Sequence, residues 1–137
     1  ADKELQLLAD YVIIGKDEVD IAVLNEEIGT KLLSEKKYLE GINYYKQALS
    51  VRKNNIPYIQ TIGLAYYNLG NYKKVIENLE NLESQSIQLD PISLYLKGMS
   101  HYFLKEPETA CKYLSKADKF QLENATIAYK KLCNNYK

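Results

Sequence analysis

The stretch that decides the fold is PYIQTIGLAYYNLGNYKKVIENLENL, residues 57–82. Its first half places apolar or small residues three and four positions apart, which is the spacing of one helix face: Ile59, Ile62, Gly63 and Tyr66. The segment NLGN, residues 68–71, is typical of a turn. A second stripe with the same spacing follows at Val75, Ile76, Leu79 and Leu82. The stretch therefore predicts two short antiparallel helices, with Gly63 where the partner helix comes close.

The same hairpin pattern recurs on both sides of this stretch. Gly29, Gly63 and Gly98 are separated by 63 − 29 = 34 and 98 − 63 = 35 residues. Three further columns keep that spacing: Gly41, Val75 and Ala110; Tyr45, Leu79 and Leu114; Ala48, Leu82 and Ala117. Four columns in step predict three helical hairpins of one kind.

A period of about 34 residues in helix–turn–helix units resembles the tetratricopeptide repeat family. The family pattern W-x2-L-G-x2-Y…A-x3-F is matched by Ile59-x2-Ile62-Gly63-x2-Tyr66…Val75-x3-Leu79, and the two outer units match it less fully. The resemblance implies an all-α fold, a right-handed α-solenoid of three hairpins with a helix before them and a capping helix after them.

We expect residues 1–137 to form a single domain of this type. Its expected parts are an N-terminal helix (1–17), three repeats (18–54, 55–89 and 90–121) and a capping helix (122–137). Asp90 and Pro91 predict the N-cap and the first residue of one helix, and Pro107 predicts the start of the next. The capping helix is expected to carry its apolar stripe as far as Tyr136.

The composition argues against two classes of function. The chain has 18 basic and 18 acidic residues, so it carries no net charge, and it shows no basic stripe of the kind that nucleic-acid binders present. No apolar run approaches the roughly 18 residues of a membrane span, so we expect no direct membrane insertion.

We find no catalytic constellation in the sequence and expect the protein not to be an enzyme. His101 is the only histidine, and it stands where the repeat usually has an aromatic residue, which favours a packed imidazole. The cysteines and the histidine lack zinc-ligand spacing, and no phosphate-binding glycine loop or nucleophile elbow occurs. We therefore expect no catalytic residue, no metal site and no cofactor.

Cys111 and Cys133 raise one covalent question. Cys111 occupies the column of Ile42 and Ile76, which faces the following helix, and Cys133 lies on the stripe by which that helix packs back. The favoured interpretation is two buried free thiols, which behave as small hydrophobes. The alternative is a disulfide, which would imply an oxidising compartment. This region resembles the C-terminal end of some Bacteroidetes-type repeat proteins, and both a cytoplasmic and a periplasmic location stay open.

In tetratricopeptide arrays the first helices of successive repeats line a concave groove that holds an extended peptide or a partner helix. The resemblance assigns the following residues to that groove: Glu26, Thr30 and Leu33; Gln60, Leu64, Tyr67 and Asn68; Tyr95, Met99, Tyr102 and Phe103. The carboxylate clamp found in some members uses Lys, Asn and Arg, and the corresponding columns hold other residue types here. We therefore expect no such clamp, and instead a groove rich in tyrosine and apolar side chains.

We accordingly predict a non-enzymatic protein-interaction module or adaptor that binds a peptide segment or helix of another protein in this groove. One alternative is a chaperone of the type III secretion kind, which holds a translocator segment. Another is a periplasmic or lipoprotein-type adaptor in envelope or secretion assembly, which a Cys111–Cys133 disulfide would favour. The competing interpretation of the groove is that the N-terminal helix, or additional chain, fills it. Partner identity and oligomeric state stay open.

Overall fold

The computed structural model describes residues 18–137, and it describes side chains from Ile21 onward. Within this range the chain forms helices and no strand, so the all-α fold class built from helical hairpins is confirmed. The described residues fall into two compact units that divide after Ala65. The N-terminal helix expected over residues 1–17, and with it the interpretation that it fills the groove, lies outside the described residues.

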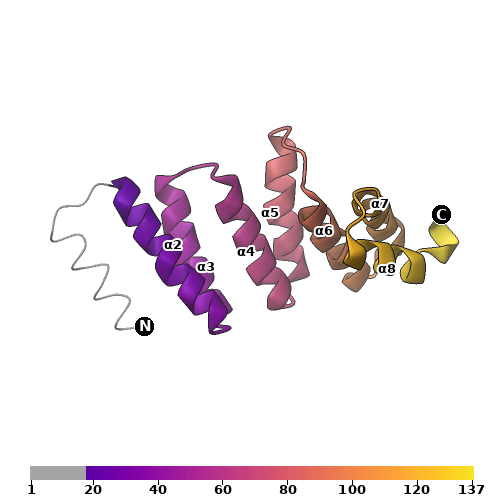
Figure 1. Ribbon diagram of the computed structural model, residues 1–137, viewed down its shortest axis with the longest axis horizontal. Coiled ribbons are helices and arrows are strands. Elements are labelled where there is room, and N and C mark those ends of the chain that lie inside the picture. Colours follow the sequence, from indigo (N-terminus) through magenta and orange to yellow (C-terminus); the bar gives the residue numbers. More distant parts are fainter. Residues whose placement is uncertain (1–17) are drawn as a thin grey trace. The chain divides into compact units, whose positions relative to one another are not determined.

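The first unit contains α2 (Glu18–Ser34), α3 (Tyr38–Val51) and most of α4 (Ile56–Asn68). Figure 1 shows α2 and α3 side by side as an antiparallel hairpin. The two helices approach closely at the glycine columns. A Cβ added at Gly29 would lie 2.7 Å from Cδ2 of Tyr45 and 3.2 Å from the carbonyl oxygen of Gly41. The small residues are therefore needed for the packing of this hairpin.

The second unit contains the last residues of α4 and four further α-helices: α5 (Tyr72–Ser84), α6 (Pro91–Phe103), α7 (Pro107–Asp118) and α8 (Glu123–Leu132). A 3₁₀ turn, η1 (Asn134–Tyr136), ends the chain. α6 and α7 form a hairpin, and α8 packs on α7. A Cβ added at Gly98 would lie 2.9 Å from Cγ of Leu114 and 3.2 Å from the carbonyl oxygen of Ala110. The columns that pair in the first hairpin therefore pair again here.

The helix starts follow from local capping. The Asp90 carboxylate accepts hydrogen bonds from the backbone N–H groups of Ile92 (3.2 Å) and Ser93 (3.4 Å), and Pro91 is the first residue of α6, as the sequence predicts. Pro107 likewise begins α7. The Asn71 side chain caps α5 by accepting from the N–H of Lys74 at 3.3 Å. Side-chain caps thus mark the starts of α5 and α6, and a proline marks the start of α7.

The three hairpin turns share one backbone conformation. Lys36, Gly70 and Lys105 all have positive φ, at 63°, 76° and 64°, and they are spaced by the same 34 and 35 residues as the helix columns. Each of them lies two residues after the end of a first helix, where a left-handed residue closes the helix. Only the middle turn uses glycine, which adopts this conformation without strain.

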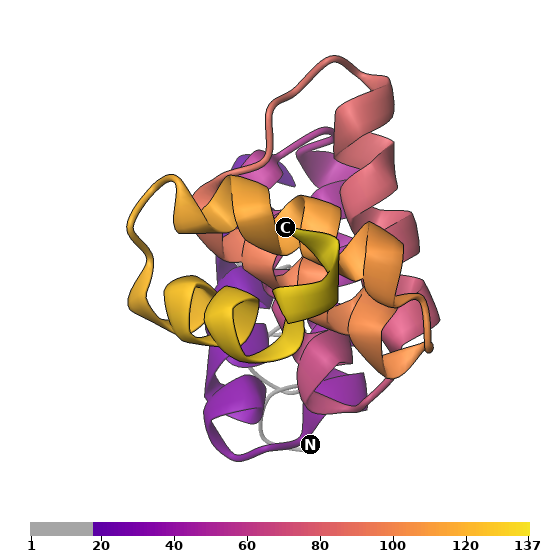
Figure 2. The same ribbon diagram turned by 90° about the vertical axis from the view of Figure 1, so that its right-hand side faces the viewer.

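The C-terminal helix is shorter than the sequence predicts. α8 ends at Leu132, and Tyr136 is exposed instead of continuing the packed stripe. The chain leaves the helix because Cys133 turns inward to form a disulfide with Cys111, and because Asn134 and Asn135 are poor helix formers. Figure 2 shows α8 and η1 against the preceding helices of the second unit.

Among the helices of residues 18–137, none is both long enough and apolar enough to cross a membrane.

Candidate functional site

In the first unit, two of the predicted groove residues are tied into the unit itself. The Tyr58 hydroxyl donates to Oε2 of Glu26 at 2.9 Å, and the Thr30 hydroxyl donates to the Glu26 carbonyl at 2.8 Å. Thr30 Oγ1 also lies 2.6 Å from the hydroxyl of Tyr45. Burial raises the pKa of Tyr58, and the hydrogen bond to Glu26 and its negative charge raise it further. The polar groups of Glu26 and Thr30 thus join α2 to α3 and α4.

The other predicted residues of the first unit differ in what they offer to a partner. Leu33 is half-buried, and its Cδ2 lies 2.5 Å from where a Cβ on Gly41 would be, so it packs into the hairpin. Gln60 is half-buried. Leu64 is an exposed large apolar residue. Of these three side chains, Leu64 therefore offers the clearest apolar surface.

In the second unit, four rings follow one another in contact. The Tyr67 and Tyr72 ring centroids are 5.7 Å apart in an edge-on arrangement, and Tyr72 stacks on Phe103 with centroids 4.8 Å apart. Phe103 then meets Tyr102 edge-on at 5.7 Å. We call these four residues the aromatic patch. It joins the end of α4, the start of α5 and the end of α6.

One end of the aromatic patch is exposed to solvent and the other end is half-buried. Tyr102 and Phe103 keep 36% and 46% of their surface exposed, whereas Tyr67 is half-buried. Burial, together with the neighbouring Tyr95 and Tyr72, raises the pKa of Tyr67 to about 12. The Tyr67 phenol therefore keeps its proton, and with it the capacity to donate a hydrogen bond, to a higher pH than an ordinary tyrosine does.

Two further predicted residues, Tyr95 and Met99, pack inward and are not part of the aromatic patch. Both are partly buried against a cluster formed by Cys111, Leu114, Ala128 and Cys133. They therefore help α6 hold α7 and the end of α8. Asn68 is the exposed last residue of α4. The residues predicted in the second unit thus separate into an exposed aromatic patch and a packed seam.

Tyr72 belongs to the aromatic patch but was not among the residues predicted from the sequence. The family's groove columns come from first helices, and Tyr72 is the first residue of a second helix. The repeat register does mark its position in the fold. Tyr72 lies 34 residues after Tyr38 and 35 residues before Pro107, and all three are the first residue of a second helix.

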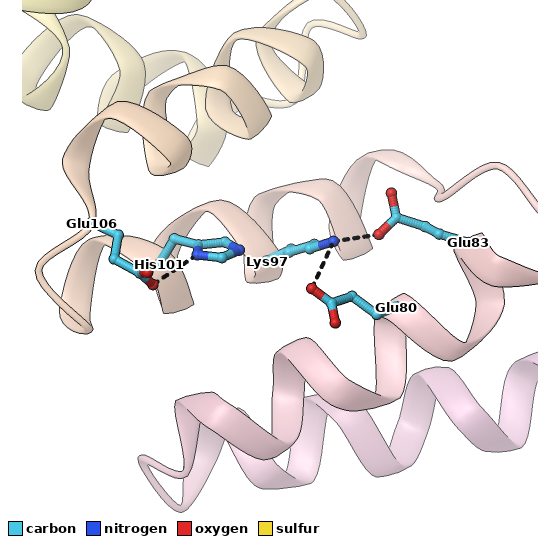
Figure 3. A network of polar contacts seen from close by, with 5 residues as sticks. All are labelled: Glu80, Glu83, Lys97, His101 and Glu106. Carbon is cyan, nitrogen blue, oxygen red and sulfur yellow. Dashed lines mark hydrogen bonds and ion pairs between the residues drawn. The ribbon is translucent and has the colours of Figure 1, made fainter.

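A second feature that the sequence reasoning missed is a buried lysine. Lys97 in α6 is 2% exposed, and its ammonium group contacts the Glu83 carboxylate and lies 3.8 Å from Oε1 of Glu80 (Figure 3). It also lies 4.5 Å from the centroid of the Tyr113 ring. Burial alone would lower the pKa of Lys97, but the contacts with Glu83 and Tyr113 outweigh burial and raise it. Lys97 therefore stays charged.

His101 extends this arrangement toward the end of α6. Its ring stacks on Tyr113, with centroids 5.7 Å apart and planes 4° apart, and its Nδ1 is 3.0 Å from Oε1 of Glu106 (Figure 3). The imidazole is thus packed between an aromatic ring and a carboxylate, as its position in the repeat predicts. Within the described part of the chain, no group of three or more His, Cys, Asp or Glu side chains is arranged to hold a metal ion.

Comparison with known proteins adds two findings. Residues 91–124, which include α6 and α7, match a family model described as tetratricopeptide repeat. The chain is also similar to the small glutamine-rich tetratricopeptide repeat-containing protein 2 of Saccharomyces cerevisiae, with 27% identity over 126 residues. That match covers 86% of this chain and 35% of the yeast protein, so the chain spans about a third of the length of this relative.

Proposed function

The chain belongs to the tetratricopeptide repeat family, and from this premise we propose that it is an adaptor whose aromatic patch binds a peptide segment or helix of a partner protein. Members of the family generally act as protein-interaction modules without enzymatic activity. The finer part of the proposal, the binding mode, rests on residues of the second unit alone.

The exposed end of the aromatic patch is the observation that carries this proposal. Phe103 and Tyr102 project apolar surface at the end of α6, and Tyr72 supports Phe103 from behind by stacking. Rings held by neighbouring rings lose little conformational entropy when they bind, and tyrosine and phenylalanine are enriched in the cores of interfaces. A partner segment with an apolar side chain would gain the most from covering these rings.

Site-specific photocrosslinking tests the proposal. Benzoylphenylalanine in place of Phe103 is expected to capture a partner in cells, whereas the same group in place of Ile127, an exposed apolar residue of α8, is not. A Tyr102→Ser, Phe103→Ser double variant with unchanged helicity should lose the same partner. Equal capture from positions 103 and 127, or retention by the double variant, would place the binding surface elsewhere.

The Cys111–Cys133 disulfide favours a second candidate role, that of an adaptor in an oxidising compartment such as the periplasm. Alkylation of unfolded protein taken directly from acid-quenched cells tests it, since a maleimide reagent adds mass only to free thiols. Protein that resists alkylation until it is reduced supports this role. Protein alkylated at both cysteines without prior reduction argues for a reducing compartment.

A further inference from the structure

A pocket of about 540 Å³ lies in the second unit, away from the residues of the aromatic patch. One wall is the link between α5 and α6, and the other is the end of α7 with the residues that follow it. Figure 2 shows this link as a long loop that leaves the end of α5 before the chain enters α6. The apolar lining consists of Ile87, Leu89, Leu94 and Phe120.

The backbone of the link keeps this pocket open. Ser86 has a positive φ of 62°, and the Ile87 N–H returns to the carbonyl of Leu82 at 3.1 Å, which ends α5 and turns the chain away from it. Leu89 is then buried beside the start of α6. Phe120 remains 61% exposed, so its ring presents apolar surface at the edge of the pocket.

The charge in this pocket is positive. Lys116 and Lys119 line it from the end of α7, and among the residues described neither of them forms an ion pair with a carboxylate. The ammonium group of Lys116 lies 5.3 Å from the centroid of the Tyr113 ring. Because this ring is neutral, it does not cancel the positive charge of Lys116. The one acidic lining residue, Glu83, is already paired with the buried Lys97. An anion entering the pocket therefore meets two free cations and one neutralised carboxylate.

We propose that this pocket is a second binding site and that it takes an acidic peptide segment with a bulky apolar side chain. The apolar side chain would lie against Leu94 and Phe120, and flanking carboxylates would pair with Lys116 and Lys119. The site shares no lining residue with the aromatic patch. The proposal therefore goes beyond the adaptor function proposed above, and each of the two can be tested without the other.

An NMR titration of the ¹⁵N-labelled chain tests this proposal. The probe is a hexapeptide with a Leu-Phe core flanked on each side by two Asp residues and capped at both ends. It is expected to shift the amides of residues 86–89 and 116–120 and to leave those of residues 102 and 103 in place. The peptide with Asn for every Asp, and the peptide with Ala-Ala as its core, should each bind at least about tenfold more weakly.

Matched variants locate the interaction. A Lys116→Gln, Lys119→Gln double variant is expected to bind the acidic peptide about tenfold more weakly, at about threefold for each exposed ion pair. A single Lys119→Gln variant should lose about threefold, whereas Lys112→Gln, an exposed lysine of the same helix outside this pocket, makes the same charge change and should lose nothing. Phe120→Ala removes a side chain that is mostly exposed, so the variant should fold and still bind about tenfold more weakly.

Four outcomes would overturn the proposal. The first is an absence of binding by the acidic peptide. The second is an equal loss in the Lys112→Gln and Lys119→Gln variants, which would indicate attraction by net charge alone. The third is saturable binding of dodecanoate at residues 116–120 without binding of the peptide, because the pocket would then take a free amphiphilic anion. Shifts confined to residues 102 and 103 would also contradict the pocket while supporting the aromatic patch.

Discussion

Lys97 is 2% exposed and yet remains charged, because its neighbours replace the water that it loses. Its two carboxylate partners are not equivalent. Glu83 makes a direct contact and has a side chain that is 34% exposed, whereas Glu80 lies at 3.8 Å with a side chain that is 58% exposed. Removing the charge of Glu83 leaves a buried ammonium group with one distant, solvated partner, which is an expensive arrangement.

We therefore expect Glu83→Gln to lower the free energy of unfolding by about 2 kcal/mol, and Glu80→Gln to lower it by about 0.5 kcal/mol or less. Urea unfolding followed by circular dichroism measures both. Equal effects of the two substitutions would show that the contact between Glu83 and Lys97 has no special role in stability.

The contribution of this pair should depend on pH in a defined direction. The pKa of Lys97 is raised above its ordinary value of 10.5 in the folded protein, so its charged form stabilises the fold fully below that value. The stabilisation is lost as the pH rises through the raised pKa. The difference in stability between wild type and Glu83→Gln is therefore expected to be constant between about pH 6 and pH 9 and to shrink above about pH 10.5. A difference that grows with rising pH would contradict this assignment.

Tyr67 should resist ionisation for the related reason that burial disfavours its phenolate. Its pKa of about 12 means that the folded chain keeps this phenol neutral at pH 11, whereas an unperturbed tyrosine with a pKa of 10 is mostly ionised. In a sample labelled with ¹³C at the tyrosine Cζ position, we expect the resonance that disappears in Tyr67→Phe to stay at its neutral shift at pH 11. An early titration near pH 10 would show that water reaches this end of the aromatic patch.

The hairpins pose a different problem, which is how three turns of one shape are made from three different sequences. Lys36 and Lys105 adopt the left-handed conformation that Gly70 adopts in the middle turn, and a non-glycine residue incurs a cost of about 1 kcal/mol there. Both lysines are exposed, so their side chains add little packing in return.

Lys36→Gly and Lys105→Gly are therefore each expected to raise the free energy of unfolding by about 0.5–1 kcal/mol, whereas Gly70→Ala should lower it by a similar amount. A Cβ at Gly70 would meet no atom within 4 Å, so the loss would come from the backbone and not from a clash. Thermal unfolding of the three variants checks the sign. A destabilised Lys105→Gly variant would show that this lysine side chain contributes to the turn.

The repeat columns predict these hairpins well because packing of two helices depends on residue size at fixed positions. Two contacts occupy equivalent places in the two hairpins: that of Gly29 with Tyr45, and that of Gly98 with Leu114. The spacing of 34 and 35 residues in the sequence is sufficient to identify these contacts as equivalent. Helix starts at Pro91 and Pro107 were predictable for a similarly local reason, since proline fixes its own backbone angle.

The candidate site was less predictable, because contacts between helices decide it. Whether Tyr95 is exposed or packed depends on where α8 lies, and the sequence stripe extended α8 beyond its end at Leu132. Tyr72 enters the aromatic patch through a turn that brings a second helix beside the end of α6, which no first-helix column reports. The buried position of Lys97 likewise depends on partners 14 and 17 residues away in sequence, on α5.

The chain divides into two compact units, and only the second contains a covalent link. Cys111 and Cys133 are 22 residues apart, and closing a loop of that length lowers the entropy of the unfolded chain enough to stabilise the fold by about 3 kcal/mol. Both cysteines are buried beside Leu114 and Ala128, so the bond holds the end of α8 to α7 within the core of this unit. In repeat proteins each unit contributes its own stability together with terms from its direct neighbours.

Reduction should therefore weaken one unit and spare the other. After treatment with a phosphine reductant we expect amide hydrogen exchange in α7 and α8 to accelerate about a hundredfold, the equivalent of about 3 kcal/mol, while amides of α2 and α3 keep their rates. A Cys111→Ala, Cys133→Ala variant should show the fast pattern with or without the reductant, which separates the effect of the bond from any effect of the reagent. If α2 and α3 accelerate as much as α7 and α8, the two units unfold as one cooperative body, and the stabilisation by the disulfide is shared across both.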